Sequence, residues 1–164
     1  MLFRSALDAA RAAGAERFAP ESFKSASDAL ARAQQAIGER DYRHALSDAL
    51  DSRERAQNAA REAADTKASR RGDAERALAE TATRVAALRD RIRTPAPRVP
   101  ARVLAARQSA LASLDQLLQD AGSAIRQDDY ARAAALLTGA REQAEELEGD
   151  LQSTGRVQPS PRSR

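Results

Sequence analysis

Apolar residues recur three or four positions apart along most of this chain, and alanine is the commonest of them, with 40 copies among 164 residues. That spacing places side chains on one face of an α-helix, whereas a strand would require strict alternation. Alanine loses no side-chain entropy when it enters a helix, so it favours this state. The pattern therefore predicts an all-α fold whose helices approach closely around a thin core of alanine and leucine.

Composition raises disorder as the alternative, because leucine, isoleucine, valine and phenylalanine together number only 26. The formal net charge is nevertheless only +3, although 31% of residues are charged, so weak self-repulsion favours a folded chain. The absence of cysteine excludes disulfides and thiolate metal sites. No apolar run approaches the ~20 residues of a membrane-spanning helix, and the first residues lack the apolar stretch of a secretory signal.

Prolines separate the helical stretches. Pro20 and Pro100 each suit the first turn of a helix, where the missing N–H costs nothing. Within 41–93 the one candidate break is Gly72, and an isolated glycine costs a helix only about 1 kcal/mol. We therefore expect one long helix there, straight or kinked at Gly72. The predicted helices cover residues 2–17, 20–39, 41–72 continuing into 73–93, 100–127 and 129–152.

These helices predict antiparallel hairpins that form two three-helix bundles sharing one long central helix, in an elongated arrangement. We expect an N-terminal bundle over 1–72, a C-terminal bundle over 73–153 and a disordered tail over 154–164. The apolar seam within 73–93 alternates by four and three as in a coiled coil, so binding to a copy of itself is the alternative to packing on its own hairpin. The seam consists of Ala74, Leu78, Thr81, Val85, Leu88 and Ile92.

A ten-residue stretch is repeated: IGERDYRHAL at 37–46 returns 88 positions later as IRQDDYARAA at 125–134. Both copies fall where a hairpin must turn. The aspartate can cap the returning helix, the tyrosine can cover the turn against the isoleucine one turn back, and the alanine lets the helices approach. The repeat predicts two equivalent helical corners, built from Ile37, Asp41, Tyr42 and Ala45 and from Ile125, Asp129, Tyr130 and Ala133.

An arginine-rich segment, residues 84–107, is a candidate basic patch, because seven arginines there face only one acidic residue. Three interpretations remain open. The arginines can be solvated and favour the dipole at the end of the long helix, they can pair with acidic surface on the other hairpin or on a second molecule, or they can dock on nucleic acid or anionic lipid. They are Arg84, Arg89, Arg91, Arg93, Arg98, Arg102 and Arg107.

Residues for catalysis are few. His44 is the only histidine, so a paired-histidine zinc motif cannot form within one chain, and a surface role near a helix start is expected for it. The acidic run at 142–150 lacks the histidines of a di-metal helix bundle. It is interpreted as a solvated face, with loose binding of divalent cations as the alternative. We expect no enzymatic activity, no cofactor and no resident metal.

Residues 6–66 carry a recurrent pattern of small residues, with an Ala-Pro before a helix and a tyrosine followed three residues later by alanine. The positions are Ala10-Arg11, Gly14-Ala15, Ala19-Pro20, Ala26, Ala33, Tyr42, Ala45, Ala49 and Ala56. In this the chain resembles bacterial envelope-associated, alanine-rich helical domains of unknown function, often found in lipoproteins. The resemblance implies a periplasmic or outer-membrane-tethered scaffold without an assigned enzymatic activity, although this chain shows neither a signal sequence nor a lipid-bearing cysteine.

Together these observations predict a non-enzymatic structural scaffold or protein-interaction module. The resemblance implies the periplasm or cell envelope if a leader is missing, and the sequence as written implies the cytoplasm. We expect protein partners, with self-association as one form of them. The alternative function is a peripheral nucleic-acid or anionic-membrane binder that uses the segment 84–107.

Overall fold

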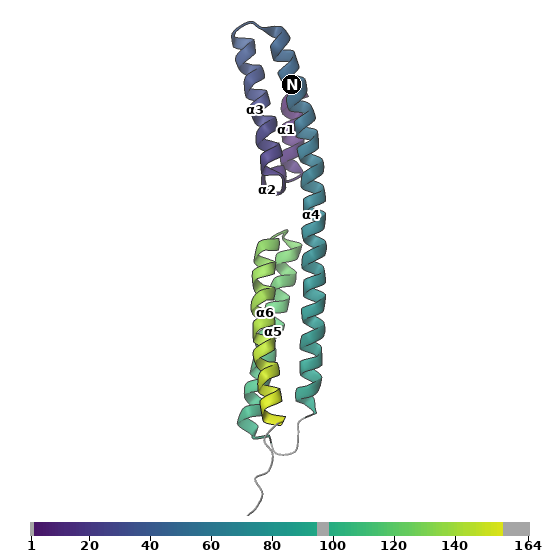
Figure 1. Ribbon diagram of the computed structural model, residues 1–164, viewed down its shortest axis with the longest axis vertical. Coiled ribbons are helices and arrows are strands. Elements are labelled where there is room, and N and C mark those ends of the chain that lie inside the picture. The colour runs from purple at the N-terminus through teal and green to yellow at the C-terminus, as the bar shows by residue number, and fades with distance from the viewer. Residues whose placement is uncertain (1, 95–98, 156–164) are drawn as a thin grey trace, which may run out of the picture. The chain divides into compact units, whose positions relative to one another are not determined.

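The computed structural model describes residues 2–94 and 99–155 (Figure 1). Over these ranges the chain is helical and contains no strand, so the predicted all-α fold is confirmed. It divides into two compact units, unit 1 at residues 1–70 and unit 2 at 71–164. The helices are α1 (Leu2–Ala12), α2 (Ala15–Phe18), α3 (Pro20–Gly38), α4 (Tyr42–Arg93), α5 (Ala101–Arg126) and α6 (Tyr130–Gly155).

Helix α4 is 52 residues long and passes through Gly72 without a break. A Cβ at Gly72 would have no neighbour within 4 Å, so no tertiary contact requires a glycine there. The division between the units falls after Arg70, inside this helix. Residues 42–70 of α4 therefore belong to unit 1, and residues 71–93 belong to unit 2.

The single helix predicted over 2–17 is wrong, because the chain breaks it at Gly14. Helix α1 ends at Ala12, and α2 is a separate turn of four residues. Gly14 has a φ of 84°, a left-handed conformation that glycine adopts without steric cost. The Phe18 ring lies so close that a Cβ on Gly14 would be 3.1 Å from its Cδ2 atom. The glycine thus lets the chain turn and lets Phe18 pack inward.

The core of unit 1 consists mostly of alanine. Among its described side chains, the large buried apolar ones are Leu7, Phe18 and Phe23. The Ser52 hydroxyl is fully buried and donates to the Ala26 carbonyl oxygen at 2.8 Å, which joins α4 to α3 and leaves no unsatisfied hydroxyl there. The buried alanines are Ala10, Ala15, Ala19, Ala26, Ala29, Ala33, Ala36, Ala45, Ala49, Ala56, Ala59 and Ala63.

Unit 2 has a core of larger side chains, where α4 meets α5 and α6. The seam predicted between Ala74 and Ile92 lies in this core, and its Thr81 hydroxyl donates to the Ala77 carbonyl oxygen at 2.7 Å. The seam is thus occupied by this chain's own helices, so it offers little exposed surface to a second copy. The cluster consists of Val85, Leu88, Ile92, Leu111, Leu114, Ala140, Ala144 and Leu147.

The disordered tail predicted from residue 154 begins too early. Helix α6 continues to Gly155, so residues 154 and 155 are helical. The rest of that tail, residues 156–164, lies outside the described residues. The same holds for Arg98 of the arginine-rich segment.

Candidate functional site

The two repeated corners share one backbone geometry. The N–H of Asp41 donates to the Ala36 carbonyl oxygen at 2.9 Å, and the N–H of Asp129 donates to that of Ala124 at 2.8 Å. Each bond closes six residues around the helix end, as in a Schellman motif. Such a motif needs one left-handed residue, and Arg40 (φ 62°) and Asp128 (φ 58°) supply it at equivalent positions. The repeat therefore encodes a specific helix-ending turn.

Each repeated aspartate caps the helix that follows it. The Asp41 Oδ1 atom accepts from the His44 backbone N–H at 3.1 Å, and the Asp129 Oδ1 atom accepts from that of Arg132 at 3.2 Å. The His44 N–H is the main cause that holds the pKa of Asp41 below its ordinary value. The exposed His44 ring also lies 3.1 Å from Asp41 Oδ2, which fits the surface role expected of it.

The two corners differ in what covers them. Tyr130 is 6% exposed and Ile125 is 6% exposed, whereas Tyr42 is 67% exposed and Ile37 is 55% exposed. The tyrosine and the isoleucine were expected to cover the turn of each corner. Both are buried in unit 2, whereas both are exposed in unit 1. The alanines behave alike, since both Ala45 and Ala133 are buried.

Unit 1 offers no helix that covers its corner within the described residues. Figure 1 shows the turn between α3 and α4 lying beyond the start of α1. Helix α1 packs with α2 and α3, and its described buried side chains are Leu7 and Ala10. In unit 2, the same corner lies beside α4, where Leu78 Cδ2 would be 3.8 Å from a Cβ on Gly122.

The exposed corner of unit 1 carries an apolar row, defined here as Tyr42, Leu46 and Leu50 of α4. Leu46 is 57% exposed and Leu50 is 51% exposed. Residues four apart lie one above the other on a helix, so the three side chains form one straight ridge. Together with Ile37, they are the exposed large apolar side chains among the described residues. All of them lie at one end of unit 1.

The arginine-rich segment is largely engaged inside unit 2. Arg84 donates from Nε and Nη2 to the two carboxylate oxygens of Glu148, each at 2.8 Å, and from Nη1 to Glu145 at 3.1 Å. These contacts raise the pKa of the Arg84 guanidinium and lower the pKa of the Glu148 carboxyl. Arg84 therefore joins α4 to the acidic face of α6.

The other arginines of the segment have mixed surroundings. Arg89 donates to both Asp115 oxygens at 2.6 and 2.7 Å, and Arg93 donates to Asp90 at 2.9 Å. Arg107 is buried and donates to the Asp150 carbonyl oxygen at 3.2 Å. Arg91 and Arg102 are exposed, and no ion pair to either lies within the described ranges. The described arginines therefore do not form one continuous patch of uncompensated positive charge.

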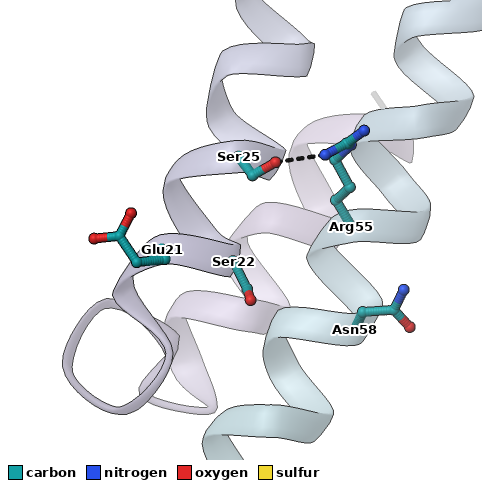
Figure 2. Close-up of a pocket in the computed structure, with 5 residues that line it drawn as sticks. All are labelled: Glu21, Ser22, Ser25, Arg55 and Asn58. Carbon is teal, nitrogen blue, oxygen red and sulfur yellow. Dashed lines mark hydrogen bonds between the residues drawn. The ribbon is translucent and has the colours of Figure 1, made fainter.

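A shallow polar groove lies between α3 and α4 (Figure 2), lined by Glu21, Ser22, Ser25, Arg55 and Asn58. Arg55 donates from Nη1 to the Ser25 hydroxyl at 2.6 Å and from Nε to Asp51 at 2.8 Å. The Ser22 hydroxyl donates to Glu62. In Figure 2 the carboxylate of Glu21 points away from the other four side chains. The hydrogen bonds around the groove therefore join α3 to α4.

Two further properties concern the described residues. They contain no group of three or more histidine, cysteine or acidic side chains arranged to hold a metal ion. None of their helices combines the length and the apolar character needed to span a bilayer.

Comparison with models of known protein families gives no match, and neither curated proteins nor solved structures match the chain. The resemblance over residues 6–66 accordingly stays an expectation. The apolar row holds three of the four exposed large apolar side chains among the described residues, which makes it the candidate functional site. Its leucines were not predicted, because Leu46 and Leu50 each follow an alanine of the regular stripe and form no separate periodic pattern of their own.

Proposed function

We propose that this chain is a non-enzymatic, helical protein-interaction module, or scaffold, that binds through the apolar row of α4. The observation that supports it most is the gathering of exposed large apolar side chains at one end of unit 1. Contiguous exposed apolar surface usually marks an interaction site. Burying such a side chain against a partner removes it from water, which favours binding.

The internal repeat provides a comparison for the apolar row. Leu46 and Leu50 correspond to Ala134 and Thr138, which are also exposed. A corner of this kind therefore folds without leucine at these positions. Large apolar residues at 46 and 50 are then available for contact with another molecule.

We further propose the bacterial cell envelope as the setting, by the resemblance of residues 6–66. The apolar row lies inside that stretch. The nucleic-acid or anionic-membrane alternative has less support, because Arg84 and Arg89 already neutralise acidic side chains of the same unit.

Photo-crosslinking in cells that express the chain tests this function. A benzophenone amino acid replaces Leu46 in one variant and the equivalent Ala134 in the matched control. We expect protein adducts from position 46 and none from position 134, because only the former lies on the proposed contact face. The function is contradicted if position 46 yields no protein adduct, or if both positions yield the same adducts in equal amounts.

A further inference from the structure

We propose that the apolar row of α4 is covered by the same row of a second copy of this chain, in an antiparallel pair. This inference rests on the proposed function and names the partner of the same surface. Three observations lead to it: the shape of the row, the charges beside it and the difference between the two repeated corners.

The shape of the row suits another helix. Tyr42, Leu46 and Leu50 are spaced by four residues, and such a ridge packs into the groove of a neighbouring helix. A two-fold axis brings the same patch of both copies together, so a self-complementary patch is all that a dimer requires. With this axis near residue 48, Leu46 of one copy lies opposite Leu50 of the other.

The charges beside the row favour an antiparallel pair. Arg43 and Glu54 are eleven residues apart, close to three helical turns, so they lie on the same side of the row. Both are exposed, and neither forms an ion pair within the described parts of the chain. The two-fold axis near residue 48 places each Arg43 opposite Glu54 of the second copy. A parallel pair in register would leave Arg43 and Glu54 of the second copy about 16 Å apart along the helix axis, too far for an ion pair.

The same register accommodates the end of the row. Arg53 follows Tyr42 by eleven residues and is exposed, so it lies on the row's own face. In the antiparallel pair it meets Tyr42 of the second copy, where a guanidinium over the ring gives a cation–π contact. The leucine contact, the ion pair and the cation–π contact are thus compatible with one alignment of the two helices.

The second corner keeps the arginine and the glutamate of this set, at 141 and 142, but lacks its other charged and leucine side chains. Arg43, Leu46 and Leu50 correspond to Ala131, Ala134 and Thr138 in α6. The buried Tyr130 of that corner already packs inside unit 2. The complete set of features that would join two copies is therefore found only at the corner that the chain leaves exposed.

Sedimentation of the purified full chain tests the pairing. The chain concentration is varied over about 1–200 μM, because one short helix face is smaller than a standard interface and should bind weakly. We expect a monomer–dimer equilibrium. Glu54→Arg should weaken it at least tenfold, since it opposes Arg43 with a like charge. Adding Arg43→Glu should restore it, because the pair is then reversed. Glu142→Arg, the same change at the equivalent exposed position of α6, should have no effect.

A second pair of variants tests the leucine contact. Leu46→Ser should abolish the dimer while leaving the helical circular dichroism unchanged, because Leu46 is mostly exposed in one copy. Ala134→Ser is its matched control. A chain that stays monomeric at the highest concentration, or a double charge reversal that does not restore association, overturns the pairing. If adducts to another protein still form at position 46 in that case, the interaction function stands and only its partner was wrong.

Discussion

At the level of single residues, two tyrosines in equivalent sequence positions have opposite surroundings. The Tyr130 hydroxyl donates to Asp128 Oδ1 at 2.8 Å within a buried corner. Burial first, and then this carboxylate, raises the pKa of Tyr130 above its ordinary value. Asp128 is also the left-handed residue of the turn. Turn geometry and tyrosine burial are thus linked through one aspartate in unit 2.

The raised pKa of Tyr130 predicts an alkaline limit for the stability of unit 2. The folded state favours the neutral phenol, so this contribution is complete below the unfolded pKa of about 10 and is lost as pH rises through the folded value. The chain has two tyrosines, so Tyr42→Phe leaves Tyr130 as the sole chromophore that ionises. We expect its phenolate absorbance to appear at higher pH than that of free tyrosine. If the Tyr130 phenol ionises at the same pH in the folded chain and in the urea-unfolded chain, the buried corner is contradicted.

At the level of the helices, Gly14 and Gly72 have different roles. Gly14 ends a helix with a positive φ and touches Phe18, whereas Gly72 lies inside α4 with no neighbour for a Cβ. Both sit among alanines and charged residues in the sequence. What sets Gly14 apart is its left-handed backbone and the Phe18 ring four residues later.

Alanine at each of the two positions should therefore have opposite effects. Gly14→Ala forces a side chain into the left-handed region and toward Phe18, which should lower the free energy of unfolding by about 1–2 kcal/mol. Gly72→Ala should raise it by up to about 1 kcal/mol, because alanine has the higher helix propensity. Urea unfolding followed by circular dichroism measures both. Equal shifts of the same sign would show that Gly14 does not form the break.

The start of α3 at Pro20 and the start of α5 just after Pro100 were predictable. Proline restricts the backbone through its own ring, whatever residues surround it. The break at Gly14 was not predictable, because a stripe of alanines with one glycine has the same periodicity whether the helix continues or stops. The apolar row was hidden for a similar reason. Leu46 lies next to buried Ala45 and Ala49 on α4, and periodicity alone does not tell which of two adjacent faces a third helix will cover.

At the level of the whole molecule, the two units use unlike cores. Unit 1 packs alanines around Leu7, Phe18 and Phe23, whereas unit 2 packs leucine, valine and isoleucine from three helices. The same corner motif occurs in both, buried in the second and exposed in the first. A repeated motif can thus be part of the core in one unit and of the surface in the other.

Spin-label distances between copies test this account most directly. The chain has no cysteine, so Ser47→Cys and Arg61→Cys each introduce one labelling site on the exposed surface of α4. Both variants are measured at a concentration where the chain is dimeric. In antiparallel copies with the axis near residue 48, the labels at 47 should be close together. Those at 61 should lie about 39 Å apart along the helix axis, against about 3 Å for those at 47, since each residue away from the axis adds 1.5 Å of rise in both copies. The absence of any distance between copies at position 47, or similar distances at the two positions, would contradict the account.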